Sequence, residues 1–362
     1  MPLNSPFEKV VTEEEIQALR ALRSAQQGRT HPLVSVALHP GYGQYPDQIA
    51  TNTCRALGHV LRKFPIWVRN LRGRLLDQED WSAAESALAE IRACGALLEA
   101  GFPVSLGGKN LETGAQAEFH IKLDHQEVIL EVWTRNLSKE QSAGIASQLE
   151  RSSVTRVFEG QAVTSSEAAI APFGSPDPKK PGDSILSNVI SRIASIKASE
   201  HQAHAKKPFV VWVDLQSNES MLFDYSHQLQ PLTCWHGAVS SGGYWYGLYG
   251  RKGDVILEGG GGMTRRNIMQ HEGRYFQVMK HGDPTRVSAF IFSSPKTTAL
   301  MENPEPANTI SPSFRKRALN LPWFEMDLSL MNWSDGLVKE MVRIQREYIA
   351  SVVAAMGFKG PR

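Results

Sequence analysis

Hydrophobic and polar positions in the middle of the chain predict one helix followed by three strands. Residues 80–101 are rich in alanine and leucine at helical spacing, and Gly101 is a typical helix-ending residue. An apolar segment at 102–106 predicts a short first strand. Residues 117–123 alternate between apolar and polar side chains, and residues 127–133 are rich in β-branched side chains. Both segments are therefore expected to be strands.

The N-terminal part of the chain predicts a helix and then a loop. Thr12 and Glu15 have the spacing of a capping box, so we expect a helix over 12–27. The His-Pro, Pro-Gly and Tyr-Pro pairs within 31–50 predict a loop.

The second half of the chain is less regular. Residues 135–182 are expected to be an insertion with a short helix near 138–150, and the glycine-rich sequence 236–262 predicts turns and short strands. Other segments predict a helix over 184–205, a buried strand over 208–215, a strand over 286–293, a loop over 302–312 and a final helix over 335–356. A parallel position for 208–215 would require the preceding helix as a crossover.

Composition narrows the class of protein. With 362 residues, 41% of them hydrophobic and 21% charged, the chain is globular rather than disordered or fibrous. Its 39 Lys and Arg against 37 Asp and Glu leave a net charge of +2, which excludes a strongly basic nucleic-acid coat as a property of the whole chain. The start has no signal-peptide pattern, no apolar run is long enough for a membrane span, and the three cysteines are far apart. We therefore expect a cytoplasmic protein.

Acidic side chains on the second and third predicted strands are candidates for metal chemistry. A hairpin would bring Glu118 and Glu131 close together, and paired carboxylates suit Mg²⁺, which can activate water against a phosphodiester. Glu90, on the preceding helix, is a candidate third carboxylate. The alternative is that these are solvated carboxylates on an exposed face of the hairpin.

The segment from about 82 to 215 resembles the PD-(D/E)XK nuclease superfamily, whose fold is restriction-endonuclease-like. That family has a helix, a hairpin carrying an acid and then an acid-x-lysine, another helix and another strand. The resemblance implies an α/β fold with a restriction-endonuclease-like core. It also implies catalytic roles for Glu118 and Glu131 as Mg²⁺ ligands, with Glu90 as the helix acid.

The resemblance divides the chain into three parts. These are an N-terminal helical extension over 1–79, the restriction-endonuclease-like core over 80–215 with its insertion at 135–182, and a C-terminal α+β region over 216–362.

Three positions depart from the family pattern. Ala117 and Glu118 stand where the family has Pro-Asp, and Trp133 stands where it has the catalytic lysine. Trp has no positive charge, and its indole N–H is only a donor. Lys122 is the nearest alternative lysine, although it lies four residues from Glu118, roughly 13 Å along a strand.

A basic segment precedes this core and has aromatic residues Phe64 and Trp67 within it. It is a candidate nucleic-acid-binding surface because cations contact phosphates and aromatic rings stack on bases. The cations are Arg62, Lys63, Arg69, Arg72 and Arg74. The alternative is a solvated face of an amphipathic helix.

These observations favour a nucleic-acid-processing or nucleic-acid-binding protein of the PD-(D/E)XK superfamily with an altered active site, which requires Mg²⁺ if it cleaves. The alternative is a non-catalytic protein–protein interaction component of a defence or mobile-element assembly. The aromatic-rich C-terminal half would then provide the partner surface.

Overall fold

The computed structural model describes most of the chain, in segments. These are residues 6–22, 30–38, 44–107, 118–134, 153–158, 161–166, 179, 183–196, 206–216, 229, 233–235, 238–260, 263–277, 285–303, 306–322, 347 and 350–357.

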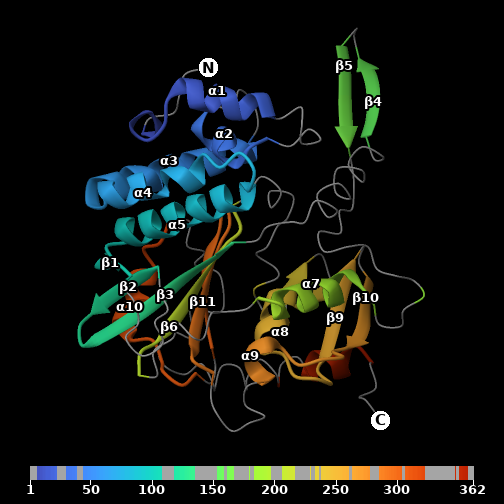
Figure 1. The fold of residues 1–362 in the computed structure, drawn as a ribbon. Coiled ribbons are helices and arrows are strands. Elements are labelled where there is room, and N and C mark those ends of the chain that lie inside the picture. Colours follow the sequence, from blue (N-terminus) through green and yellow to red (C-terminus); the bar gives the residue numbers. More distant parts are fainter. Residues whose placement is uncertain are drawn as a thin grey trace.

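A six-stranded mixed sheet lies at the centre of the structure (Figure 1). Its order is β1 (Val104–Leu106), β2 (Phe119–Leu123), β3 (Gln126–Thr134), β6 (Phe209–Asp214), β11 (Val287–Ser293) and β12 (Thr298–Glu302). The strands β1, β2 and β3 form an antiparallel meander, β3, β6 and β11 are parallel, and β12 is antiparallel to β11. The predicted helix, three strands and later buried strand are confirmed.

N-terminal helices cover one face of this sheet (Figure 1). They are the short 3-10 helix η1 (Phe7–Lys9), α1 (Glu13–Ala21), α2 (Pro32–Ala37), α3 (Gln44–Lys63), α4 (Pro65–Leu75) and α5 (Trp81–Glu99). Later in the chain, α10 (Pro312–Ala318) joins the same hydrophobic cluster through Phe314. The helices α3 and α5 pack so closely that a methyl group at Gly95 would overlap the backbone of Ala56.

The opposite face of the sheet packs against α7 (Ile185–Ala194) and α8 (Gly243–Tyr249). Every residue of α8 is buried, and a side chain at Gly247 would overlap Ile193 of α7. Beside these helices lie α9 (Arg274–Gln277) and the hairpin of β9 (Val255–Gly260) and β10 (Met263–Ile268) (Figure 1). Both faces of β6 and β11 are therefore covered, which explains why these strands are continuously apolar.

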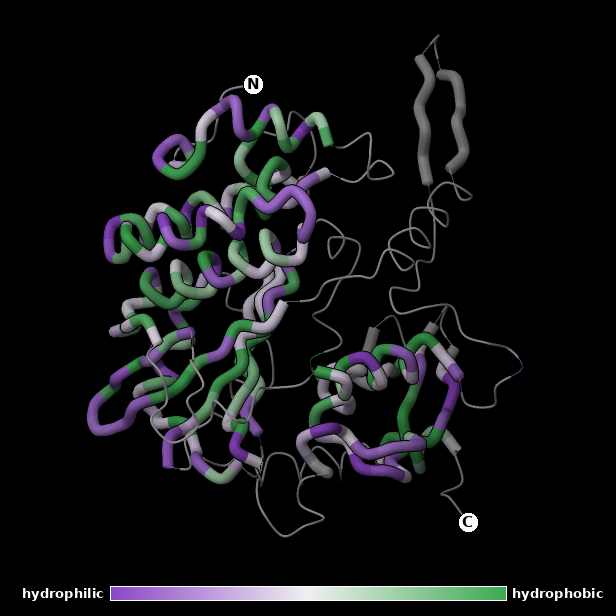
Figure 2. The backbone as a smooth tube through the Cα atoms, in the orientation of Figure 1, coloured by the Kyte–Doolittle hydropathy of each residue, from purple (hydrophilic) through white to green (hydrophobic). Residues whose placement is uncertain are grey.

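Alternating side chains set the orientation of the β2–β3 hairpin. Phe119, Ile121 and Leu123 are buried toward the N-terminal helices, as their spacing predicts. The turn is hydrophilic (Figure 2), and Asp124 adopts a φ of 52° there. Two further antiparallel pairs are β4 (Ser153–Phe158) with β5 (Gln161–Ser166), and β7 (Thr233–Trp235) with β8 (Ala238–Ser240).

Helix ends follow local signals in several places. The capping box of Thr12 and Glu15 is confirmed, and Gly101 follows α5 with a φ of 77°. The helix expected over 184–205 begins after Ser184, whose side chain caps it, but ends at Ala194. The short helix expected near 138–150 lies outside the described residues.

The loop expected over 31–50 is wrong for residues 32–37 and 44–50, which are helical, while residues 39–43 lie outside the described part of the chain. Pro32 occupies the first turn of α2, where its missing N–H costs nothing, and the His31 ring accepts a hydrogen bond from the Leu33 N–H. The helix α3 then begins at Gln44. Pro32 and Pro46, which indicated a loop, instead lie in the first turns of α2 and α3.

Only some of the described strands after residue 216 lie outside the central sheet, namely the two-stranded pairs β7–β8 and β9–β10. The strands β11 and β12 extend the same sheet as β1, β2, β3 and β6, so the expected boundary at 215–216 falls within one structural layer. The helix α8 and strand β12 were not expected from the sequence.

Candidate functional site

Glu118 and Glu131 come together at the open end of the β2–β3 hairpin. The register pairs Phe119 with Leu130, so the next position along the hairpin pairs Glu118 with Glu131. The Gly107 N–H donates to the Glu118 carbonyl oxygen at 2.7 Å, which ties this end of β2 to β1. Directly opposed residues on an antiparallel pair lie on the same face of the sheet.

The environment of Glu118 disfavours its charged form. Burial is the largest cause, and the charges of Glu131 and Glu90 act in the same direction, so the pKa of Glu118 is raised to about 7. Backbone hydrogen bonds at Glu118 and Val132 oppose this shift but do not cancel it. One carboxylate oxygen of Glu118, Oε2, is buried with no hydrogen-bond partner among the described residues.

Glu90 approaches the same cluster from α5. Its two carboxylate oxygens accept hydrogen bonds from Arg74 of α4, at 3.1 Å from Nη1 and 2.7 Å from Nη2. The charges of Glu90 and Glu131 both act on Glu118, so each of these two carboxylates lies within electrostatic range of Glu118. We call Glu90, Glu118 and Glu131 the carboxylate cluster.

Lys122 is not brought to this cluster. It is exposed on β2 and opposes Glu127 at the turn end of the hairpin, four residues from Glu118. Trp133 lies two residues beyond Glu131, and its half-buried side chain packs against the hydrophobic cluster that contains α7 and α8. Neither residue therefore places a positive charge beside Glu118 and Glu131.

A second polar group on the hairpin was not expected from the sequence. Glu127 pairs with His120 Nδ1 at 2.6 Å and with Lys207 Nζ at 2.9 Å. Burial raises the pKa of Glu127, but hydrogen bonds from His120 and Lys207 and their charges outweigh burial, so the net shift is downward. Lys207 comes from a distant part of the chain, which local spacing could not reveal.

The predicted basic segment is divided between two helices. Arg62 and Lys63 end α3 and are exposed, as is Arg69 on α4. Arg74 is the cation that reaches the carboxylate cluster. Arg72 instead binds α1, through the Glu15 carboxylate and through the Val10 carbonyl at 3.1 Å.

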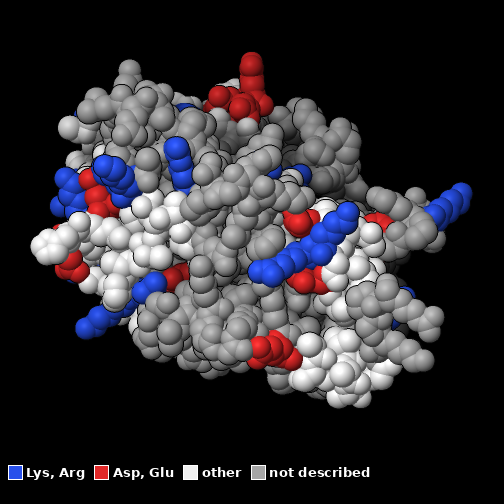
Figure 3. Space-filling view, turned by 90° about the horizontal axis from the view of Figure 1, so that it is seen from below, with Lys and Arg blue, Asp and Glu red and all other residues white. Residues whose placement is uncertain are grey.

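The aromatic residues of this segment face the protein interior. The Trp67 ring packs edge-on against Phe119 with centroids 5.7 Å apart, and Phe64 is packed against the same hydrophobic core. Both rings therefore stabilise the fold rather than present a face for base stacking. On the side seen in Figure 3, described basic and acidic side chains are interspersed rather than gathered by sign.

Glu118 and Glu131 fit a hard divalent cation with oxygen ligands. The described residues contain no group of three or more His, Cys, Asp or Glu side chains arranged to hold a metal. Mg²⁺, however, commonly uses one or two carboxylates and keeps several water ligands. The unpartnered Oε2 of Glu118 is an acceptor that such a cation would satisfy.

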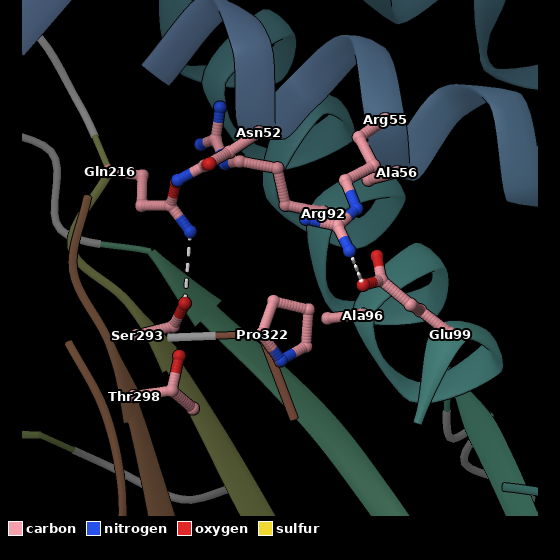
Figure 4. Close-up of a pocket in the computed structure, with 10 residues that line it drawn as sticks. All are labelled: Asn52, Arg55, Ala56, Arg92, Ala96, Glu99, Gln216, Ser293, Thr298 and Pro322. Carbon is pink, nitrogen blue, oxygen red and sulfur yellow. Dashed lines mark hydrogen bonds and ion pairs between the residues drawn. The ribbon is translucent and has the colours of Figure 1, made fainter. Parts of the chain in front are cut away.

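A second buried polar network joins α5 to the carboxyl ends of the parallel strands. Figure 4 shows part of it, with Asn52, Arg92, Gln216 and Ser293 around a small pocket. Arg92 and Asp214 form a bidentate ion pair at 3.0 and 2.8 Å, with side chains only 3% and 2% exposed. Gln216 donates to Ser293 Oγ at 2.9 Å and accepts from Asn52 at 2.8 Å. The sequence signal available for this network was Arg92, a charged residue within the alanine-rich segment 80–101.

The cavity within this network is small. Its space for water-sized molecules is about 20 Å³, which is enough for about one water. The network therefore cross-links α3, α5 and β6 rather than forming a substrate pocket.

The fold and the site together define an α/β protein with a mixed sheet and a carboxylate cluster at one end of a hairpin. Comparison of the chain with protein-family models, curated proteins and solved structures gave no significant match. Among the described residues, no helix combines the length and apolar character needed to span a membrane.

Proposed function

We propose that this chain is a nucleic-acid-processing or nucleic-acid-binding protein of the PD-(D/E)XK superfamily, with an altered metal-dependent site. The observation that carries the proposal is the opposition of Glu118 and Glu131 across the β2–β3 hairpin, with one buried Glu118 oxygen that has no described partner. A divalent cation such as Mg²⁺ would be held by these two carboxylates.

The topology supports this proposal. The helix α5 leads into the antiparallel strands β1, β2 and β3, and β6 then pairs with β3 in parallel. The helix α7 lies between β3 and β6 along the chain. This order of elements agrees with the one that the superfamily resemblance implies. Glu131 lies on β3, and Glu118 directly precedes β2.

The side chains define what the site can do. Bound Mg²⁺ polarises a phosphoryl oxygen and lowers the pKa of a coordinated water. Glu118 and Glu131 would hold the cation, while Glu90 is held by Arg74 and acts as an auxiliary carboxylate. The exposed Arg62, Lys63 and Arg69 would contact the nucleic-acid backbone.

The altered part of the site is Trp133. Its indole cannot take up a proton from water or offset phosphate charge. Lys122 is too far along β2 to replace the missing lysine directly. We therefore propose metal-assisted nucleic-acid binding as the retained function, with cleavage slower than a lysine-containing site would give.

The experiment is a calorimetric titration of the full chain with Mn²⁺ at pH 8, followed by incubation with plasmid DNA and Mn²⁺. Glu118→Gln and Glu131→Gln should each abolish saturable Mn²⁺ binding. Glu127→Gln is the matched control, because it removes a carboxylate from the same hairpin without touching the opposed pair.

Unchanged Mn²⁺ binding in Glu118→Gln or Glu131→Gln would contradict the proposed site. Cleavage that persists in Glu131→Gln would show that a different site or a contaminant acts on the plasmid.

The alternative of a protein-interaction component receives less support. Its expected partner surface was the aromatic-rich C-terminal half, but Tyr244, Trp245, Tyr246 and Tyr249 are all buried in α8. Their rings pack against one another and against the sheet instead of facing a partner.

A further inference from the structure

We propose that Arg74 is the phosphate-binding residue of this site and provides the positive charge that Trp133 cannot. The inference rests on the proposed function, because it assigns Arg74 to a phosphodiester bound beside Glu118 and Glu131. It identifies the ligand as the anionic backbone of a nucleic acid and the contact as charge-assisted hydrogen bonding.

The geometry of Arg74 suits this role. Its two terminal nitrogens bond to both oxygens of Glu90, which fixes the plane of the guanidinium group. A guanidinium group has five N–H donors, so this pair leaves others for a ligand. The Arg74 side chain remains 40% exposed, whereas Glu90 is 14% exposed, so the cation lies on the solvent side of the pair.

The position of Arg74 matters because acidic side chains surround the proposed phosphate site. The negative charges of Glu90 and Glu131 both act on Glu118, and these carboxylates would repel an approaching phosphate. Arg74 is bound directly to one member of the carboxylate cluster and therefore lowers its net negative charge. A rigidly held guanidinium can also bind phosphate through two parallel hydrogen bonds, which a flexible lysine does less well.

Arg72 provides a natural comparison within the same helix. It is also an arginine of α4 in an ion pair, and its side chain is 43% exposed, close to that of Arg74. Its partners, Glu15 and the Val10 carbonyl, belong to the N-terminal region and not to the carboxylate cluster. Exposure and charge are therefore matched, while location differs.

The test measures two affinities in the full chain. Fluorescence anisotropy follows binding of a short labelled DNA duplex, and of its single strand, over a series of salt concentrations without divalent cation. Calorimetry follows Mn²⁺ binding without DNA. The variants are Arg74→Gln, Arg74→Lys and Arg72→Gln.

Arg74→Gln should weaken DNA binding about fivefold to tenfold and reduce the salt slope by about one. The same substitution should tighten Mn²⁺ binding by about three- to tenfold, because a positive charge has left the carboxylate cluster. Arg74→Lys should keep the salt slope. Arg72→Gln should leave both affinities as in the wild type.

Opposite changes in the two affinities separate phosphate binding from a structural role. Weaker binding of both DNA and Mn²⁺ by Arg74→Gln, or an unchanged salt slope, would overturn the assignment of Arg74. If Arg74→Gln does not fold, the test uses Arg74→Lys. A folded Arg74→Lys variant whose DNA binding has a smaller salt slope than the wild type would also overturn the assignment of Arg74. Failure of the wild type to bind Mn²⁺ would instead overturn the proposed metal site.

Discussion

Glu118 directly opposes Glu131 across the β2–β3 hairpin, and its carboxyl group has a pKa raised to about 7 by burial and by neighbouring negative charge. Two carboxylates in this relationship destabilise each other when both are ionised. The folded protein therefore carries an electrostatic cost that a proton or a cation can relieve.

Glu118→Gln should stabilise the protein at pH 8 and have little effect near pH 4.5. The folded-state pKa is raised, so protonation of Glu118 contributes stability that is fully present below pH 4.5 and is lost as the pH rises through about 7. Denaturant unfolding at pH 8 should show a gain of about 1–3 kcal/mol for the variant. A loss of stability at pH 8 would contradict this assignment.

Glu127→Gln should have the opposite effect on stability and destabilise the protein at neutral pH. The pKa of Glu127 is lowered overall, because hydrogen bonds and charges from His120 and Lys207 outweigh its burial. Its stabilising contribution is present above the unfolded pKa and is lost as the pH falls through the lower folded pKa. Denaturant unfolding at pH 7 should therefore show that the variant is less stable than the wild type.

Mn²⁺ should raise the melting temperature more at pH 8 than at pH 5.5. Protons and cations compete for Glu118, so metal binding strengthens as this carboxyl ionises. Ligand binding to the folded state then raises its stability by mass action. Differential scanning fluorimetry should detect the difference in the wild type, and Glu118→Gln should abolish it.

Arg92→Ala should be among the most destabilising single changes in the described part of the chain. It leaves Asp214 as a buried charge without its bidentate partner. We expect a loss of about 3–5 kcal/mol in the free energy of unfolding. The double variant Arg92→Met with Asp214→Leu should recover much of that loss, since it removes both charges, and calorimetric melting would measure both effects.

Two helical glycines should respond differently to alanine. A methyl group at Gly95 would overlap Ala56 of α3, whereas Gly73 on α4 has open space around the same position. Gly95→Ala should therefore destabilise the fold by separating α3 from α5. Gly73→Ala should stabilise it by about 0.5–1 kcal/mol through helix propensity. Equal effects in denaturant unfolding would contradict the close packing of α3 and α5.

Local sequence patterns predicted the elements that hold the carboxylates. The alternation of Phe119, Ile121 and Leu123 identified the buried face of β2, and the acidic positions followed on adjacent strands. The cap at Thr12 and the positive φ at Gly101 were also predictable, because each depends on a few neighbouring residues.

Other local patterns were ambiguous. Pro32 is compatible with a loop or with the first turn of a helix, and the hydrogen bond from Leu33 to the ring of the preceding His31 belongs to the helix. The aromatic sequence of α8 likewise gave no clear helical signal, because a helix buried on every side has no polar face.

The sequence by itself therefore determined the helix and three-stranded meander, with Glu131 on β3 and Glu118 next to the start of β2. Only the tertiary structure decided that Arg74 binds Glu90 while Arg72 binds α1, and that β11 and β12 complete the sheet. The physical reason is the sequence separation over which each interaction acts. Hydrophobic periodicity and helix capping involve residues only a few positions apart. Ion pairs and strand partners depend instead on segments that folding brings together from distant parts of the chain.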